Sequence, residues 1–339
     1  DRSVSRGLGD VYKRQLQYHA RYYSHTGSAY EYMKVLIVAN KNSGSFSPFV
    51  IEQGSSIAYE GVEVEYFGVI GKGWTGYLSC RKKLIKKIEE CKPDLIHAHY
   101  GLCGLLANLQ RKVPVVTTFH GCDVQSTTML RCLSRLAMYL SKYNIFVLKS
   151  MPDRAGYKKK NYSVVPCGVD LSVLKPMDME EARKLLNWNT KDIYVLFAGS
   201  FDEPVKDSLL AKKCIVLADN CKLVELKGYK RSEVNLLMNA CNLLLVTSIR
   251  ESGPLVVKEA MACNRPIVST DVGDVKFVLG ETKGCYITSR DEADCVDQIR
   301  KAIQFSMKYS QTDGRDRIID LGLDIHEIAK KIICLYKQF

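Results

Sequence analysis

Residues 247–264 read TSIRESGPLVVKEAMACN and combine the end of a strand, a tight turn and a helix. Upstream, residues 242–248 form an apolar run of strand length. Downstream, residues 255–263 have helical character and follow Pro254, a residue suited to a first helical position. In an open α/β sheet, this order presents a helix N-terminus at the carboxyl ends of the strands. The free N–H groups and the helix dipole there favour a bound phosphate.

Two glutamates, Glu251 and Glu259, bracket this turn and lie eight positions apart. Carboxylates repel phosphate, so they are unexpected beside an anion site unless they accept hydrogen bonds from hydroxyl groups. A sugar and a ribose both offer such hydroxyls. The alternative is that one glutamate is merely solvated and the other merely decorates a helix.

The turn, the following residues 259–262 (EAMA) and the strand at 266–270 (PIVST) together resemble the paired-glutamate motif of family 4 retaining glycosyltransferases. The resemblance implies an α/β protein of the GT-B fold, with two Rossmann-like domains facing a central cleft. It also implies that Glu251 reaches hydroxyls of the donor sugar and that Glu259 holds the ribose diol of the nucleotide.

Strands and helices alternate along the rest of the chain, which predicts two parallel sheets with crossover helices. We expect strands near 33–40, 62–69, 94–99, 113–119, 145–148, 193–198, 223–227, 242–248, 266–270 and 285–288. We expect helices near 48–59, 77–91, 102–110, 126–140, 180–186, 208–218, 233–240, 255–263, 293–307 and 325–336. The first strand is not followed by Gly-x-Gly-x-x-Gly, which argues against a nicotinamide enzyme.

The expected domain limits follow from this order. Residues 164–170 (VVPCGVD) resemble the junction between the two domains of the family, so we expect an acceptor-side domain at 33–165 and a nucleotide-sugar domain at 166–322. Residues 323–339 should cross back to the first domain as a helix. Residues 1–32 are expected to be a non-native or disordered leader, because residues 1–15 resemble translated adaptor read-through and Met33 is a plausible start.

Further site residues come from the resemblance. Lys206 matches the lysine that neutralises the donor diphosphate, although it could be an ordinary loop lysine. The family usually has an arginine where Ser200 stands, with Arg250 a possible substitute. Pro254 has no N–H to donate. The implied nucleotide-sugar site comprises Gly44, Ser200, Lys206, Arg250, Glu251, Ser252, Gly253, Leu255, Val256 and Glu259.

Histidines supply the last candidates. His120, in the segment HGCD, resembles the His-Gly-x-Asp turn that faces the cleft, and we group it with Glu251 and Lys206 as catalytic. A lone histidine is otherwise more often structural. His97 and His99 lie on one face of a strand. A metal pair is conceivable there, but a third ligand is not apparent and a structural role is favoured. We expect no metal, and no cofactor either, because the nucleotide sugar is a substrate.

Charge and composition limit the partners. Hydrophobic residues make up 46% of the chain, and no apolar run reaches the ~20 residues of a membrane helix. Thirteen cysteines without a Cys-x-x-Cys suggest reduced thiols in the cytoplasm. Residues 33–166 carry nineteen basic and nine acidic groups. One predicted helix could touch an anionic membrane, or simply be solvated, through Arg81, Lys82, Lys83, Lys86 and Lys87. Nucleic acid is not expected, since aromatics are not interleaved.

The family resemblance implies a retaining hexosyltransferase. It would move a sugar from a nucleotide-diphosphate donor to a glycan, lipid-linked or small-molecule acceptor, in cell-surface polysaccharide or glycolipid synthesis. We expect a cytoplasmic protein, peripheral at the inner face of the membrane. The alternatives are a nucleotide-sugar epimerase of the same fold and a non-catalytic protein that binds sugar nucleotides or glycans.

Overall fold

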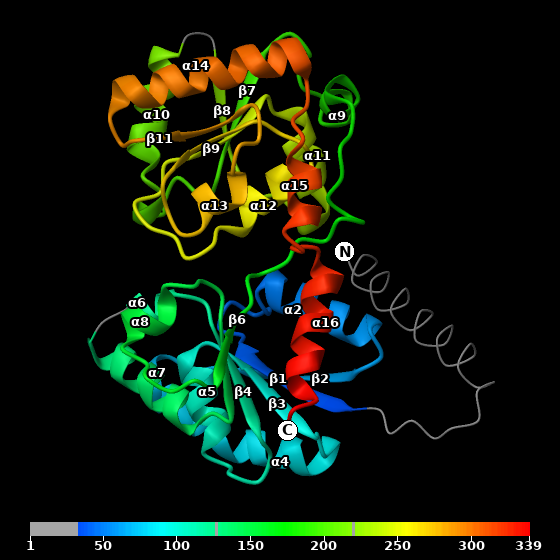
Figure 1. Ribbon diagram of the computed structural model, residues 1–339, viewed down its shortest axis with the longest axis vertical. Coiled ribbons are helices and arrows are strands. Elements are labelled where there is room, and N and C mark those ends of the chain that lie inside the picture. The colour runs from blue at the N-terminus through cyan, green and yellow to red at the C-terminus, as the bar shows by residue number, and fades with distance from the viewer. Residues whose placement is uncertain (1–32, 126–127, 219–220) are drawn as a thin grey trace, which may run out of the picture. The chain divides into compact units, whose positions relative to one another are not determined.

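A computed structural model describes residues 33–125, 128–218 and 221–339 of the chain (Figure 1). The expected leader at 1–32, including the suspected read-through at 1–15, lies outside the described residues. Residues 34–339 form one compact unit.

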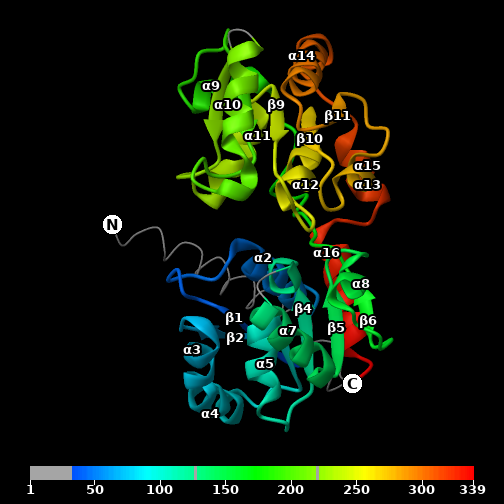
Figure 2. The same ribbon diagram turned by 90° about the vertical axis from the view of Figure 1, so that its left-hand side faces the viewer.

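The first sheet is built from six parallel strands in the order β2-β1-β3-β4-β5-β6. The strands are β1 (Lys34–Asn40), β2 (Glu63–Val69), β3 (Leu95–His99), β4 (Val115–Phe119), β5 (Tyr143–Phe146) and β6 (Tyr162–Val164). The interior of β1, the apolar run VLIVA, is fully buried, as expected of a parallel strand covered by helices on both faces (Figures 1 and 2).

The helices of the first half are α2 (Pro48–Tyr59), α3 (Gly73–Ser79), α4 (Arg81–Cys91), α5 (Gly101–Asn108), α6 (Cys122–Gln125), α7 (Thr128–Leu140) and α8 (Met151–Ala155). The single helix expected at 77–91 is wrong, because the chain breaks at Cys80 into α3 and α4. Gly71 and Gly76 pack closely where α3 begins, since a side chain on Gly71 would collide with the Gly76 carbonyl.

The second sheet has five parallel strands in the order β11-β10-β9-β7-β8. They are β7 (Ile193–Phe197), β8 (Cys221–Glu225), β9 (Leu243–Val246), β10 (Ile267–Thr270) and β11 (Cys285–Thr288). Val195, Leu243 and Val268 of this sheet pack with Leu210 and Ile299 in one buried apolar cluster. The prediction of two parallel α/β sheets is therefore confirmed.

The helical segments of the second half are α9 (Met179–Leu185), η1 (Pro204–Lys206), α10 (Ser208–Leu217), η2 (Arg231–Glu233), α11 (Val234–Ala240), α12 (Leu255–Ala262), α13 (Val275–Leu279), α14 (Glu292–Tyr309), α15 (Gly314–Asp320) and α16 (Ile325–Tyr336). The two short helices α13 and α15 and the short strand β6 were not expected from the sequence.

The last helix, α16, packs against α2, one of the helices that cover the first sheet. Tyr336 is buried, and its hydroxyl lies 2.5 Å from Nδ1 of His97 on β3. At the other end of the helix, His326 contacts Glu60 just after α2. The segment before α16 also forms a parallel bridge between Asp324 and Val169 in the predicted junction. The domain limits 33–165, 166–322 and 323–339 remain predictions.

Across the described residues, no helix is both long enough and apolar enough to cross a bilayer.

Candidate active site

The turn at the centre of the sequence motif lies where predicted, between β9 and α12. The hydroxyl of Thr247, just after β9, donates to the backbone carbonyls of Lys206 and Asp207 at 2.8 and 3.0 Å. This ties the turn to the loop that carries the candidate phosphate lysine. Pro254 is the residue before the helix rather than its first residue, because its backbone is extended (φ −64°, ψ 112°). The first-turn amides of α12 therefore follow Pro254, on Leu255 and Val256.

Lys206 and Glu251 are brought together at this turn. Lys206 Nζ lies 2.7 Å from Glu251 Oε1, and the Ser248 hydroxyl donates to the same oxygen at 2.9 Å. Gly199, just after β7, makes the approach possible, because a Cβ there would lie 3.0 Å from the Lys206 side chain. Two of the three residues grouped as catalytic thus form one ion pair of low exposure.

Glu259 lies on α12 and is only 3% exposed. Burial raises the pKa of Glu259, and the neighbouring Arg231 guanidinium opposes that rise. Arg231 Nη1 lies 2.5 Å from Glu259 Oε1. Its Nε lies 2.5 Å from Glu52 Oε1 on α2. Arg231 and Glu52 were not identified from the sequence, where 179 positions separate them.

A buried lysine on α12, Lys258, bonds to residues that surround the turn. Lys258 is 1% exposed, and its Nζ lies 3.2 Å from both the Cys167 carbonyl and Asp274 Oδ2. The Asp274 carboxylate would lie 3.1 Å from a Cβ on Gly253, so the glycine makes room for this pair. Sequence reasoning did not single out Lys258, although a lysine inside the apolar run LVVKEAMA was a usable signal.

His120 follows β4 and lies in a cluster of rings. Its Nε2 is 3.0 Å from His99 Nδ1, and its ring is 4.7 Å from Phe49 and 4.6 Å from Tyr100. Burial lowers the pKa of His120 well below its usual range, with a further contribution from His99. The imidazole is therefore neutral at pH 7.

The next residue brings the His120 turn against the glutamate turn. A Cβ on Gly121 would overlap the hydroxyl of Ser252, and the backbone of Gly121 is left-handed (φ +105°). Only glycine meets both conditions at low cost. His120 and Ser252 are thus neighbours through Gly121.

The remaining predicted residues are placed less centrally. Ser200 accepts a hydrogen bond from the Asp202 N–H at 3.3 Å, and Arg250 is exposed. Gly44 lies in an exposed turn after β1, with φ +86° and its N–H donating to Lys41 at 3.1 Å. In the part of the chain that the structure describes, no hydrogen bond or ion pair links Gly44 to the turn that carries Glu251.

The alternative reading of His97 and His99 as a metal pair finds no support in their contacts. His97 uses both ring nitrogens on protein groups, Nδ1 with Tyr336 and Nε2 with Thr118 at 2.7 Å. Within the described ranges, no three His, Cys, Asp or Glu side chains gather in a way that could hold a metal ion. The structural role favoured from the sequence fits these contacts.

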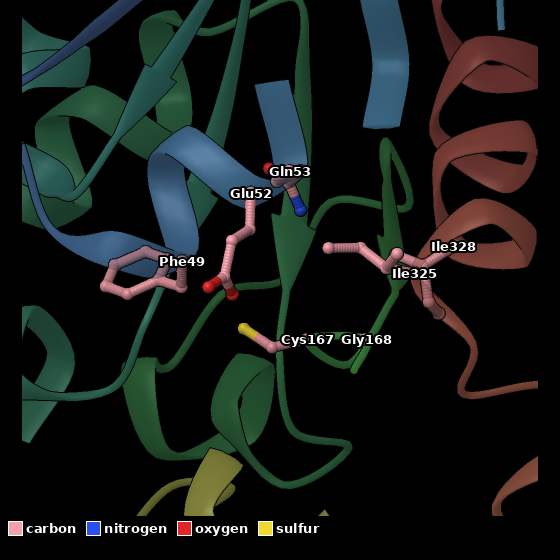
Figure 3. Close-up of a pocket in the computed structure, with 7 residues that line it drawn as sticks. All are labelled: Phe49, Glu52, Gln53, Cys167, Gly168, Ile325 and Ile328. Atoms are coloured by element: carbon pink, nitrogen blue, oxygen red, sulfur yellow. The ribbon is translucent and has the colours of Figure 1, made fainter. Parts of the chain in front are cut away.

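A small cavity lies beside α2, where the Glu52 carboxylate points toward Cys167 (Figure 3). Its volume is about 10 Å³, which is room for a single water molecule. A sugar nucleotide cannot occupy this space. The candidate site remains the group of residues around the Lys206–Glu251 pair.

Solved glycosyltransferase structures share this arrangement of two parallel sheets. Anabaena HepE in complex with UDP is 16% identical, with 91% of this chain and 100% of that chain covered and a TM-score of 0.70. A likeness at this identity shows the fold alone. The fold class of the chain is therefore GT-B, as predicted.

Family comparisons define the group more closely. A model described as Glycosyltransferase Family 4 matches residues 33–173, and one described as Glycosyl transferases group 1 matches residues 178–304. Together they span most of the chain, which belongs to the group 1, family 4 glycosyltransferases. The predicted family and the predicted enzyme class, a hexosyltransferase, are confirmed.

Two relatives illustrate the match. An uncharacterized glycosyltransferase of Methanocaldococcus jannaschii is 27% identical over 260 residues, covering 67% of this chain and 70% of that protein. The putative teichuronic acid biosynthesis glycosyltransferase TuaC of Bacillus subtilis is 25% identical over 223 residues, covering 58% and 57%. The roles of individual site residues remain predictions.

Proposed function

We propose that this protein is a retaining hexosyltransferase that uses a nucleoside-diphosphate sugar and acts without a metal ion or other cofactor. The observation that carries the proposal is the Lys206–Glu251 pair at 2.7 Å. Glu251 lies in the turn before α12, and the buried Glu259 lies on α12 itself. A cation, free amides and two carboxylates together suit a ligand that carries both phosphate and hydroxyl groups.

In this proposal the donor diphosphate lies against the amides of Leu255 and Val256 and against Lys206. The ribose diol donates to Glu259. The UDP bound in the Anabaena structure supports a nucleotide-sugar donor for this fold. Ser200 and Arg250 are assigned to the same donor, with Arg250 as an exposed cation beside Glu251.

The ion pair lets Lys206 change its partner when the donor binds. When sugar hydroxyls donate to Glu251, that carboxylate no longer needs Lys206, and the lysine turns to the diphosphate. Lys206 then stabilises the charge that builds on the leaving group, which is catalysis by positioning and electrostatics. Neutral His120 donates one hydrogen bond to the donor sugar without adding charge.

The acceptor is proposed to be a glycan or lipid-linked saccharide, in surface polysaccharide or glycolipid synthesis. The name of TuaC and the basic first half of the chain support this class. The protein would then act in the cytoplasm at the inner face of the membrane. Helix α4 is the weaker candidate for that contact, because Lys86 pairs with Glu90 and Lys87 pairs with Glu65.

The test is incubation of the full chain with UDP-, GDP- and ADP-hexoses, with and without a panel of saccharide and lipid-linked acceptors, in the presence of EDTA. We expect one nucleoside diphosphate to be released with an acceptor-dependent product, whose anomeric configuration by NMR matches that of the donor. An inverted product, or an epimerised donor without transfer, would overturn the proposal. A thermal-shift screen with UDP, GDP and ADP identifies the base first, because saturating ligand at ~100 Kd stabilises by about 2.7 kcal/mol.

A further inference from the structure

Helix α7 packs inward through small side chains. Ser134, Ala137 and Ser141 are buried, and Ser134 sits so close to α5 that a Cβ on Gly101 would collide with it. The Ser141 hydroxyl receives a hydrogen bond from Asn108 at 3.0 Å. The same inner face carries Met138, which is buried in an apolar cluster with Phe119 and Phe146.

Four large apolar residues of α7 are nevertheless exposed. Met129 is 56% exposed and Leu136 is 46% exposed. The exposed side chains recur at helical spacing and form one stripe, which we call the α7 stripe: Met129, Cys132, Leu136, Tyr139 and Leu140. Helix α7 contains no aspartate or glutamate. In Figure 2 the helix faces the viewer over the first sheet.

Positive charge surrounds the α7 stripe. Residues 128–160 hold eight basic residues and one acidic residue, so most of the excess charge of the first half lies here. Arg131 and Arg135 flank the stripe on the helix itself. Lys159 Nζ lies 5.2 Å from the centre of the Tyr139 ring. A tyrosine with a lysine beside it suits a boundary between apolar and aqueous phases.

A depression lined by basic residues lies at the C-terminal end of the stripe. Beside Leu140 lies an open depression of about 530 Å³. It is lined by the cations Arg111, Lys112 and Lys142 and by Phe339, and none of its lining residues is an aspartate or a glutamate. Apolar and cationic groups therefore continue from the helix into a recess large enough for a phosphate headgroup.

We propose that the α7 stripe and its basic border are a membrane-binding surface, on which α7 lies in the interface of a bilayer that contains anionic lipid. An amphipathic helix with an apolar face and a cationic edge binds such interfaces by apolar burial and charge attraction together. A second copy of the chain is a poorer occupant, since its own eight basic residues would face the same charge. The proposal rests on no assignment in the donor site and places the contact on α7 rather than on α4.

The test is sedimentation of the full chain with phosphatidylcholine vesicles, with and without 30% phosphatidylglycerol, at 0.05 and 0.5 M NaCl. The first variant is Leu136→Ser with Tyr139→Ser, which removes apolar surface. Its matched control is Leu209→Ser with Val216→Ser, two exposed apolar residues of α10. The second is Arg131→Gln with Arg135→Gln, matched by Lys82→Gln with Lys83→Gln on α4. Thermal unfolding and size-exclusion chromatography of each variant check folding and self-association.

We expect the wild type to sediment with anionic vesicles at low salt. The partition coefficient should fall at least tenfold in both α7 variants and less than twofold in both controls. Equal partitioning of the α7 variants and the wild type would overturn the proposal. So would equal binding to neutral vesicles at both salt concentrations, or a wild-type dimer that the α7 variant converts to a monomer while vesicles bind neither.

Discussion

Glu251 and Glu259 each contact a basic side chain in the free protein, Lys206 at 2.7 Å and Arg231 at 2.5 Å. Carboxylates of low exposure need such partners, because burial disfavours their charge. A donor that binds here exchanges ion pairs for hydroxyl and phosphate contacts, so its affinity reports a difference between two sets of interactions.

Lys206→Ala removes the cation that is proposed to face the leaving group. We expect kcat and kcat/KM to fall by about a hundredfold or more, since one such preorganised group contributes about 2.7–4 kcal/mol in the transition state. Steady-state rates with the identified donor measure this. The control is Lys213→Ala. Lys213 is an exposed lysine of α10 that pairs with Glu292 of α14. Rates within twofold of wild type would make Lys206 an ordinary loop lysine.

Glu259→Gln keeps the side-chain volume and removes the charge. We expect the affinity for the nucleoside diphosphate to weaken by about tenfold or more, because hydrogen bonds to a charged group contribute about 1.5–3 kcal/mol. The fold should persist, since Arg231 retains Glu52. Isothermal titration calorimetry gives the affinity, with the exposed Glu281→Gln as control. Equal dissociation constants for both variants would contradict the ribose assignment.

At the scale of elements, the two turns that meet at Gly121 and Ser252 make another prediction. Gly121→Ala should lower both stability and turnover, because it adds a collision with Ser252 to the cost of a left-handed backbone. Gly61→Ala isolates the backbone cost, since Gly61 has φ +93° and an added Cβ there meets nothing within 4 Å. We expect about 1–2 kcal/mol for Gly61→Ala and a larger loss for Gly121→Ala.

Urea unfolding and turnover of the two variants check this. Removing the Ser252 hydroxyl in a Gly121→Ala, Ser252→Ala double variant should restore part of the lost stability. If both glycine variants lose the same stability and keep full turnover, the close approach of the turns has no role in the site.

How far the sequence predicts the elements depends on whether the cause is local. Strand β1 and helix α16 follow from apolar runs and helical periodicity, and their limits agree with the structure to within a residue. The break at Cys80 between α3 and α4 is not marked by the helical periodicity of residues 77–91, which runs through it. In the site, Lys206 and Glu251 were identified by motif, whereas Arg231 required the fold to bring Glu52 and Glu259 to it.

At the scale of the whole molecule, the buried His97 and His99 and the half-buried His120 should make the fold sensitive to acid. Burial lowers the pKa of His99 to about 3, and the pKa values of His97 and His120 also lie well below 6.5. Below about pH 6.5, these histidines bind protons in the unfolded chain but not in the folded chain. The free energy of unfolding therefore falls as the pH drops through 6.5. His99 alone contributes about 2 kcal/mol of this loss by pH 5.

Asp123 acts in the opposite direction. Burial raises its pKa to about 6, so its contribution to stability falls as the pH rises from about 4 to 6. Three histidines outweigh one aspartate, and we expect urea unfolding to show a net loss of stability between pH 8 and pH 5. The slope should be smaller in His99→Gln or His120→Gln than in the wild type. A flat profile in the wild type would contradict the neutral, buried state of these rings.

The return of α16 to the first sheet also affects how the protein is made. His97 on β3 finds its partner Tyr336 only after 238 intervening residues have been synthesised. At ribosomal rates of 5–20 residues per second, the first sheet waits roughly 10–50 s for its last helix. During that time the surface that α16 covers is open, and the nascent chain should depend on chaperones until its final turns emerge.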